Sequence, residues 1–213
     1  MKINKLLIAL TVAIFSTFAM ADEEINYSVS IKDWYHTLRD DATSSRINAV
    51  VMSGTAKKGD YFATLSMLLP SNYYHEDGTY LTRRDTDLAL GWSVNSNVAV
   101  LGGVKKIGSN NFNFSGSTAT ASPSTFNISY LGLNGFTSVS EKSFLYGTAT
   151  KSLKVTKSNQ PTASLTLTTY DVGYGYVLNK STQLSLGYRS QVLRNDGSNT
   201  TLSGFIFGSS FNF

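Results

Sequence analysis

The sequence predicts an all-β protein: a closed, antiparallel, up-and-down β-barrel that spans a membrane with about ten strands, eight being the alternative count. The first observation is that apolar residues alternate with small or polar ones over most of the chain, which is the period of a strand with two different faces. The second is composition, because only 15% of the 213 residues are charged while 12% are aromatic. The third is that no run of about 18 apolar residues follows the N-terminal segment. With a mean hydropathy of -0.09, this excludes a membrane protein built from helices.

The first 21 residues have the features of a cleaved secretory signal peptide. Lys2 and Lys5 supply the positive charge, residues 6–18 form an apolar run too short to span a bilayer, and Ala19-Met20-Ala21 is a small-x-small cleavage site. A buried N-terminal helix is the alternative. We therefore expect residues 1–21 to be removed on export and residues 22–213 to form a single barrel domain.

Ten segments carry the alternating pattern. They are residues 25–38, 46–57, 60–69, 84–94, 98–107, 125–137, 143–155, 163–178, 182–193 and 201–213. The clearest is 84–94, in which one face carries Thr86, Leu88, Leu90, Trp92 and Val94 and the other carries Asp87, Ala89, Gly91 and Ser93. The first face is expected to contact lipid, with Leu90 midway along the strand, and the second to face the lumen.

The connections between these segments alternate in length. Short ones are expected around residues 57–60, 95–97, 138–142 and 179–181, and longer ones at 39–45, 70–83, 108–124, 156–162 and 194–200. Short turns at one end and longer loops at the other are typical of outer-membrane barrels. All three prolines, Pro70, Pro123 and Pro161, fall in the longer set. Because proline cannot donate to a strand ladder, we expect none of them inside a strand.

A soluble β-sandwich also alternates, and three features argue against it. The non-apolar face often carries Gly, Ser or Thr, which suits a narrow lumen. Ten strands without disulfides must hide their edges, and barrel closure does so. Aromatic residues also gather near the strand ends, as expected for rings at a membrane–water interface. They are Tyr27, Trp34, Tyr35, Tyr61, Tyr73, Tyr74, Trp92, Tyr170, Tyr174, Tyr176, Phe211 and Phe213.

The last eight residues resemble the C-terminal signal of bacterial outer-membrane proteins. Gly208, Phe211 and Phe213 fit its glycine and its antepenultimate and final aromatics, while Ile206 departs from it where a polar residue is usual. The mature chain thus resembles the small outer-membrane barrels such as OmpA, OmpX and OmpW, which usually have eight strands. This resemblance implies a place in the outer membrane of a Gram-negative cell. It also implies contact with outer-membrane lipids and lipopolysaccharide, and recognition by the barrel-assembly machinery.

Composition excludes several kinds of site. The chain has no cysteine and only two histidines, His36 and His75, which excludes disulfides, thiolate zinc sites and multi-histidine metal sites. The net charge is +4 without a basic block, so no nucleic-acid partner is predicted. No cofactor is expected.

Charged residues on the polar faces form the main predicted site. Lys32, Asp87, Lys105, Asp171 and Arg189 are expected to face inward, together with Gln191. Buried charges must be paired to be tolerated, so we expect a lumenal salt-bridge network. A lumen of about this size is nearly filled by side chains.

One enzymatic alternative rests on Asp85-Thr86-Asp87. This carboxylate pair near the outer rim, with His75 in the preceding loop, resembles the site of the omptin proteases, which are ten-stranded barrels. The second Asp-x-His pair of that family has no counterpart here. The structural alternative is that Asp85 and Asp87 pair with basic neighbours, namely Arg83, Arg84, Lys105 or Lys106.

A second enzymatic alternative rests on His36, predicted to face the lumen near the rim. Nearby hydroxyl and carboxyl residues are Ser44, Ser45, Asp33, Asp40 and Asp41. Lipid A-modifying barrels resembling PagP or PagL use a histidine with a serine, although the spacing here matches neither. A histidine can act as general base to a serine, and a rim histidine in a polar network is the alternative.

The predicted function is that of a non-enzymatic, integral outer-membrane barrel with a structural or surface-contact role through polar outer loops, notably residues 109–124. A narrow diffusion pore for small solutes is the first alternative. A lipid A-modifying enzyme or an omptin-like protease is the second.

Overall fold

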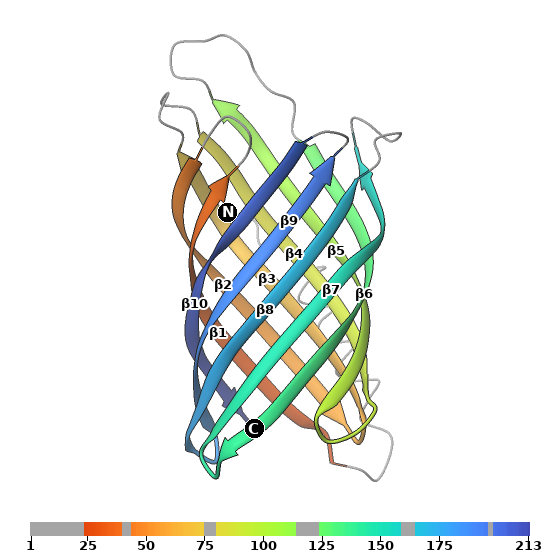
Figure 1. The fold of residues 1–213 in the computed structure, drawn as a ribbon, viewed down its shortest axis with the longest axis vertical. Coiled ribbons are helices and arrows are strands. Elements are labelled where there is room, and N and C mark those ends of the chain that lie inside the picture. Colours follow the sequence, from red (N-terminus) through yellow and green to blue (C-terminus); the bar gives the residue numbers. More distant parts are fainter. Residues whose placement is uncertain (1–23, 40–43, 75–79, 114–123, 159–164, 196–197) are drawn as a thin grey trace.

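The computed structural model describes residues 24–39, 44–74, 80–113, 124–158, 165–195 and 198–213, and the described chain forms ten antiparallel strands (Figure 1). They are β1 (Asn26–Arg39), β2 (Ser44–Lys58), β3 (Tyr61–Tyr74), β4 (Tyr80–Ser93), β5 (Val98–Asn113), β6 (Ser124–Ser140), β7 (Ser143–Lys157), β8 (Thr166–Asn179), β9 (Thr182–Asn195) and β10 (Ser198–Asn212). Each strand pairs with its neighbours in sequence. The predicted all-β, up-and-down architecture is confirmed, with ten strands rather than eight.

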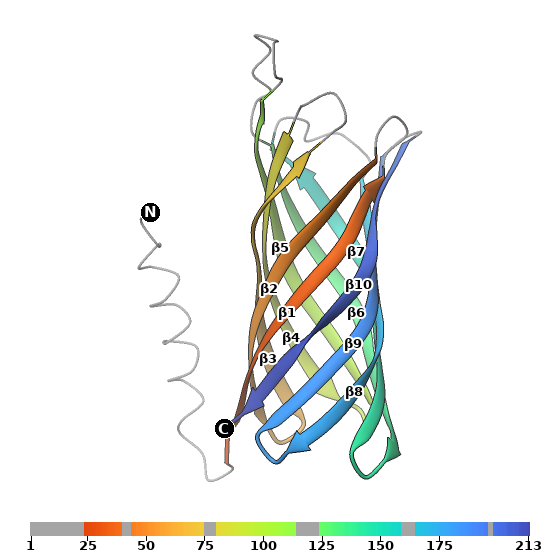
Figure 2. The same ribbon diagram turned by 90° about the vertical axis from the view of Figure 1, so that its left-hand side faces the viewer.

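The barrel closes between its first and last strands. β1 pairs with β10 from Ser28↔Asn212 to Arg39↔Thr201, and Figure 2 shows the two lying side by side. At the end of this seam, the amide of Phe213 donates to the carbonyl of Tyr27 over 2.9 Å. The sheet therefore has no free edge along the seam, which is the condition for placing strands in lipid.

The two ends of the barrel differ in their connections. At one end, here the turn end, strands are joined by residues 59–60, 94–97, 141–142 and 180–181; at the other, the loop end, by residues 40–43, 75–79, 114–123, 158–165 and 196–197 (Figure 1). In the tight turn after β2, Gly59 has φ 54°, a left-handed conformation that glycine adopts without steric cost.

The strands extend further toward the loop end than the sequence pattern predicts. They contain 14 to 17 residues, whereas about 9–11 suffice to cross a bilayer. Residues 70–74, 80–83 and 108–113, expected in loops, belong to β3, β4 and β5. The longer connection expected at 194–200 is wrong, because β9 and β10 extend to Asn195 and Ser198 and only residues 196–197 join them.

The prediction that no proline lies inside a strand is wrong for Pro70, which lies in β3. The pairing of β3 with β4 shifts between Leu68 and Ser71. Proline is tolerated here because a bulge does not require its missing N–H in the ladder. Pro123 and Pro161 lie outside the described residues.

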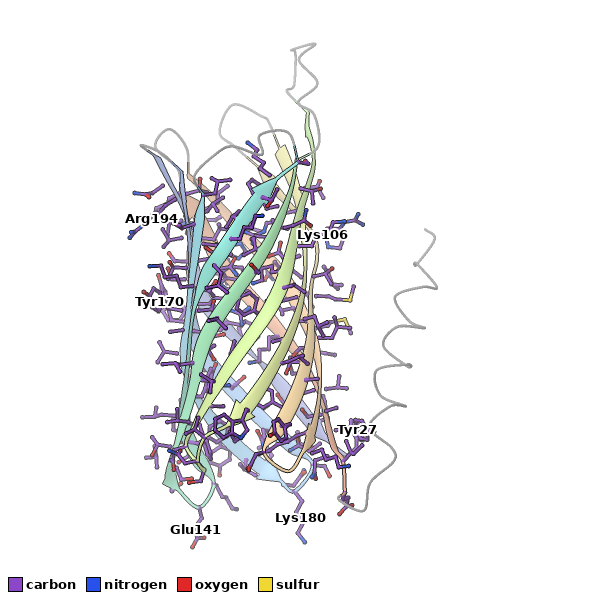
Figure 3. All side chains as sticks on the ribbon, turned by 90° about the vertical axis from the view of Figure 1, so that its right-hand side faces the viewer. Tyr27, Lys106, Glu141, Tyr170, Lys180 and Arg194 are labelled. Carbon is purple, nitrogen blue, oxygen red and sulfur yellow. The ribbon has the colours of Figure 1, made fainter. Side chains whose placement is uncertain are left out.

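The outer surface carries the apolar faces of the strands (Figure 3). Leu90, Trp92, Val172 and Leu186 are 46–60% exposed, and Tyr170 projects outward in Figure 3. One predicted interfacial aromatic is misplaced: Trp34 is only 1% exposed and faces the lumen, because it has the parity of Lys32 and His36 on β1. Among the described residues no helix is long and apolar enough to cross a membrane.

The outward face of β4 sets the depth of its residues. It begins with Trp92 at the turn end and continues through Leu90 and Leu88 to Arg84 near the loop end. An aromatic ring and a charge mark the two interfaces, so Leu88 lies midway between them. The prediction that Leu90 lies midway is therefore wrong, because β4 extends to Tyr80.

We expect Leu88→Arg to destabilise the barrel by about 2–4 kcal/mol, because a charge near the bilayer midplane is poorly solvated. The matched variant Leu90→Arg, one outward position closer to the interface, is expected to cost less. Urea unfolding of both variants in lipid vesicles measures the difference. Equal losses for the two would contradict this assignment of depth.

Candidate functional site in the barrel lumen

The lumen changes in character along the barrel axis. Near the loop end it is apolar, in the middle it is ionic, and toward the turn end it is lined by hydroxyl and amide side chains. The apolar part consists of two buried clusters. One contains Trp34, Leu38, Ile47, Ala49, Val51, Leu68, Leu202 and Ile206, and the other Ile107, Ile128, Val155, Leu165 and Leu167. Most of these residues lie in the halves of their strands nearer the loop end, while Val51 and Ile206 lie close to the middle of β2 and β10, so much of this half of the lumen is packed like a protein core.

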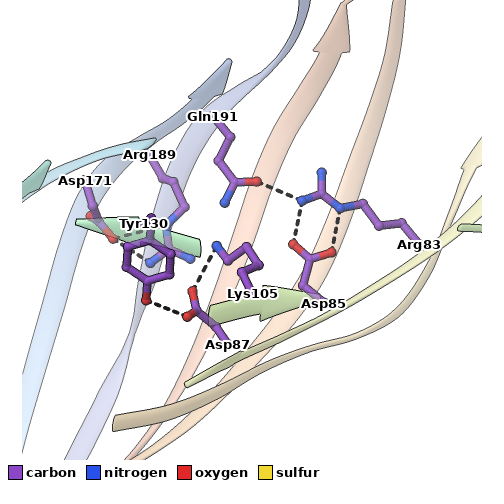
Figure 4. Close-up of polar contacts among 8 residues, drawn as sticks. All are labelled: Arg83, Asp85, Asp87, Lys105, Tyr130, Asp171, Arg189 and Gln191. Atoms are coloured by element: carbon purple, nitrogen blue, oxygen red, sulfur yellow. Dashed lines mark hydrogen bonds and ion pairs between the residues drawn. The ribbon is translucent and has the colours of Figure 1, made fainter. Parts of the chain in front are cut away.

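A contact across the full width of the barrel lies beside these clusters (Figure 4). Arg83 on β4 forms a two-point ion pair with Asp85, with Nη2–Oδ2 and Nε–Oδ1 distances of 2.5 and 2.7 Å. The same Nη2 donates to Oε1 of Gln191 on β9 over 2.9 Å. In a closed ring of ten strands, β4 and β9 are five positions apart, which places them on opposite walls. All three residues are buried.

A second cluster is centred on Asp87. Its Oδ2 lies 3.0 Å from Nζ of Lys105 on β5, and its Oδ1 accepts a 2.6 Å hydrogen bond from the hydroxyl of Tyr130 on β6. The ring of Tyr130 needs the glycine beneath it, because a Cβ on Gly103 would lie 2.5 Å from the tyrosine hydroxyl. Three neighbouring strands are thus joined through one carboxylate.

A third cluster joins β8 and β9. Arg189 donates to Oδ2 of Asp171 from Nη2 over 2.5 Å and from Nε over 3.1 Å. Its guanidinium also lies 5.6 Å from the ring centroid of Trp34. His36 stacks on the same tryptophan, with ring centroids 3.9 Å apart. Its Nδ1 lies 2.9 Å from the Trp34 carbonyl oxygen, within hydrogen-bonding distance.

Lys32 differs from the other lumenal cations. Its Nζ lies 5.4 Å from the ring centroid of Tyr146, and the ion pairs of the described residues do not include it. The middle of the described lumen holds four cations, Lys32, Arg83, Lys105 and Arg189, against three carboxylates, Asp85, Asp87 and Asp171, and Lys57 lines the wall nearer the turn end. The middle of the lumen therefore carries an excess positive charge.

Two adjoining cavities occupy the rest of the lumen. The first, about 230 Å³, is bounded by the ionic residues. The second, about 510 Å³, is lined by Ser53, Thr55 and the turn residues Asn95 and Asn97, so it lies toward the turn end. Lys32, Asp171 and Arg189 line both cavities, which makes them continuous at that level.

The structure joins four of the five predicted network residues into two ion pairs, Asp87–Lys105 and Asp171–Arg189, and leaves Lys32 without a carboxylate. Sequence reasoning missed Tyr130 and the lumenal role of Trp34, and it placed Arg83 in a loop. Trp34 lies two residues from both Lys32 and His36, so its side chain must point to the same face of β1 as theirs. This alternation predicts a lumenal position for Trp34. The expected pairing of Asp85 and Asp87 with basic neighbours is confirmed, by Arg83 and Lys105 respectively, but the position of Arg83 inside β4 was not predicted because the strand extends to Tyr80.

Among the residues that the structure describes, neither enzymatic alternative is assembled. Asp85 is engaged by Arg83, and Asp87 by Lys105 and Tyr130, so each carboxylate is neutralised. Asp33 faces outward, where its Oδ2 accepts a 3.1 Å hydrogen bond from Asn48. The expectation that it lies near the His36 side chain is wrong, because the two residues are three positions apart on β1 and their side chains point to opposite faces. The other candidates, His75, Asp40, Asp41 and the side chains of Ser44 and Ser45, lie outside the described residues.

Within the described parts of the chain, no group of three or more His, Cys, Asp or Glu residues could hold a metal ion.

The residues of the C-terminal motif divide between the two faces of β10. Phe211 and Phe213 are 38% and 78% exposed on the outer surface. Gly208 faces inward, and a Cβ there would collide with the carbonyl of Ile31 and with Lys32. A side chain at position 208 would therefore disturb the closing seam.

Comparison with known proteins identifies the fold. No protein-family model and no curated protein matches the sequence. The outer membrane protease OmpT of Escherichia coli aligns over 91% of this chain and 97% of its own, with a TM-score of 0.55 and 11% identity. The fold is that of the outer-membrane β-barrels.

Two further outer-membrane barrels align with TM-scores of 0.42, too low to carry an argument. Neisserial surface protein A matches over 87% of this chain and 95% of its own at 11% identity, and Ail of Yersinia pestis over 89% and 99% at 10%. At such identities only the fold of this outer-membrane barrel is established.

Breaking the cross-lumen contact is expected to destabilise the barrel. Asp85→Asn leaves the Arg83 guanidinium buried without a carboxylate, which costs about 3–5 kcal/mol. Replacing both residues with leucine should recover much of this loss, because the uncompensated charge is then gone. Urea unfolding in vesicles measures both, with Asp60→Asn at the exposed β2–β3 turn as the control that should change little. A loss for Asp60→Asn as large as that for Asp85→Asn would contradict the role assigned to the pair.

Proposed function

We infer that this protein is a non-enzymatic, integral outer-membrane barrel that serves as a rigid anchor for its outer loops. The observation that carries this function is the Arg83–Gln191 contact between opposite walls, set among two apolar clusters. A lumen filled in this way suits a structural or surface-contact protein better than an open channel. The loops at the loop end, including polar residues 114–123, would make any such contact.

The distribution of outward charge supports this orientation and a lipopolysaccharide partner. Seven exposed basic residues of the described chain face outward in the halves of their strands nearer the loop end; they are Arg39, Arg46, Arg84, Lys106, Lys151, Lys154 and Arg194. Other exposed lysines, Lys57, Lys142 and Lys180, lie near the turn end. Figure 3 shows Lys106 and Arg194 toward that end. The described acidic residues lie elsewhere: in the lumen, near the turn end, or at Asp33 midway along β1. Arginine and lysine are suited to the phosphate groups of lipopolysaccharide, whose leaflet would surround this end.

Export and assembly complete the proposal. The predicted signal peptide, residues 1–21, would direct the chain across the inner membrane. The barrel-assembly machinery would then recognise the terminal strand through Gly208, Phe211 and Phe213, in line with the outward position of both phenylalanines. The protein would reside in the outer membrane of a Gram-negative cell.

An enzymatic function receives less support. OmpT is described as a protease, but a shared fold does not transmit an activity. The two aspartates resembling the omptin pair are occupied by Arg83, Lys105 and Tyr130.

Planar-bilayer recordings test the proposed function. We expect the purified, folded protein to give no sustained channel conductance, because side chains close the loop end of the lumen. The double variant Arg83→Ala/Gln191→Ala, which removes the cross-lumen contact, serves as the comparison and is expected to conduct more than the wild type. Steady single-channel steps from the wild-type protein would favour the narrow pore instead, for which the two continuous cavities would form the inner part of the path.

Removal of the terminal aromatic tests the assembly proposal. We expect deletion of Phe213 to lower sharply the folded, heat-modifiable form in outer-membrane fractions, because the assembly machinery would no longer recognise the strand. Phe205→Ala, which removes an outward aromatic of the same strand outside the motif, is the matched control and should retain most of the folded yield. An unchanged folded yield after deletion of Phe213 would contradict the proposed role of this residue.

A further inference from the structure

We propose that the lumen contains a binding site for a small protonated oxyanion, of the hydrogen phosphate type, reached from the turn end and anchored by Lys32. The site lies where the two cavities meet, between Lys32 and Trp34 on β1 and Tyr146, Asp171 and Arg189 on β7, β8 and β9. This inference goes beyond the proposed function, because an anchor for outer loops requires no ligand.

The first argument is charge. Lys32 lies beside the ring of Tyr146 and belongs to none of the described ion pairs. Asp171 is the carboxylate that attracts it, and this carboxylate already pairs with Arg189, which repels Lys32. One carboxylate does not balance two cations in a poorly solvated lumen, and an anion in the adjoining cavity would supply the missing negative charge.

The second argument is the set of unused hydrogen-bonding groups around Lys32. The indole Nε1–H of Trp34 is buried without a partner in a residue only 1% exposed. The buried hydroxyl of Tyr146 interacts with the hydroxyl of Ser185, but the two do not form a well-aligned hydrogen bond. Both can donate, and Trp34 can only donate. Unmade bonds of buried donors cost free energy, and the oxygens of an anion would accept from them.

The acceptors at the site narrow the class of ligand. Oδ1 of Asp171 and Oγ1 of Thr169 are buried and unpaired. A fully deprotonated anion would face the Asp171 oxygen without a hydrogen to offer it. Hydrogen phosphate carries both acceptor oxygens and an O–H donor. Its oxygens could accept hydrogen bonds from Lys32 and Trp34, and its O–H could donate to Asp171. The charge of Asp171 is meanwhile balanced by Arg189.

The third argument is space and access. The inner cavity, about 230 Å³, exceeds several times the roughly 30 Å³ that one water occupies in the liquid. The outer cavity continues it to the turn end and has Lys57 in its wall, a second positive charge along the path. Residues of the apolar clusters, including Trp34, form part of the wall of the inner cavity, whereas the outer cavity opens toward the polar turn residues Asn95 and Asn97, so a polar ligand would enter and leave through the turn end.

The fourth argument is that the backbone fixes the position of the ligating groups. A Cβ on Gly173 or Gly187 would lie 2.5 or 2.6 Å from the Tyr146 hydroxyl, so these two glycines seat the tyrosine. A Cβ on Gly208 would lie 2.6 Å from Cα and 2.8 Å from Cγ of Lys32, so this glycine leaves room for the lysine stem. Groups held in place by their surroundings lose little freedom on binding a ligand, which favours affinity.

Titration of the folded protein in detergent with inorganic phosphate tests the proposal. Trp92→Phe makes Trp34 the single tryptophan, since the chain has only two, and its fluorescence then reports on the cavity directly. We expect a saturable change in emission, and matching heats by calorimetry. Lys32→Gln should weaken binding by about tenfold or more, because a charge-assisted hydrogen bond is lost. The matched control Lys106→Gln, which removes an outward-facing lysine, should leave the affinity unchanged.

Several outcomes would overturn the proposal. They are no saturable change at millimolar phosphate, equal affinity in Lys32→Gln, or equal loss in Lys106→Gln. Should Lys32→Gln fail to fold, Tyr146→Phe takes its place, because it removes one donor and keeps the ring; unchanged affinity there also contradicts the site. Sulfate, which carries no proton at neutral pH, is expected to bind more weakly than phosphate, and the reverse order would contradict the assigned ligand class. Conductance is recorded separately, so failure of the anchor function is distinguishable from failure of this site.

Discussion

The structure depends on the pairing of β1 with β10. In lipid every backbone amide and carbonyl needs a partner within the protein, and the seam from Ser28↔Asn212 to Arg39↔Thr201 supplies the pairs that an open sheet would lack. The seam also fixes which side chains face inward, since a slip of one residue would exchange the two faces of a strand. With the observed register, Gly204 and Gly208 face the lumen, and a Cβ at either would meet the backbone of β1. The register that closes the barrel therefore also determines which side chains fill the lumen.

The inward faces must then fill a narrow, poorly solvated space. At the loop end they do so with aliphatic side chains and Trp34, whose burial is favourable in itself. In the middle they use charges, and there each described carboxylate meets a cation: Asp85 with Arg83, Asp87 with Lys105, and Asp171 with Arg189. This pairing avoids isolated buried charges, which are strongly destabilising. Lys32 stands outside the pairing, so it is the position at which the lumen is electrostatically incomplete.

Much of the fold was predictable because one physical pattern repeats ten times. Strand alternation located every strand, and on β4 and β8 it separated the lipid-facing from the lumenal residues. The strand ends were less predictable, because beyond the bilayer both faces of a strand can be polar and the alternation of apolar and polar residues is lost. The pattern of residues 70–74 and 80–83 therefore predicts a loop. Trp34 was misplaced because an aromatic near a strand end suits an interface and a lumen equally well. The sequence alternation predicts an inward direction for the side chains of Lys32, Asp87, Lys105, Asp171 and Arg189. Which of them pair depends on register and stagger around the ring, which a single strand does not encode.

The Arg83–Gln191 contact favours a ring of ten strands over rings of other sizes, because it can form only at one barrel diameter. Pairs such as Asp171–Arg189 join adjacent strands and would survive in a barrel of another size. A contact between β4 and β9 requires walls separated by the lengths of an arginine and a glutamine, and thus a particular diameter. The link from Tyr130 on β6 to Asp87 on β4 spans β5 and so depends on local curvature. A ring with a different strand count or stagger would break both contacts and leave Arg83 and Asp87 with fewer partners in a space with little water. The lumenal polar groups thus act against incorrect closure, a use of buried polar residues in which specificity matters more than net stability.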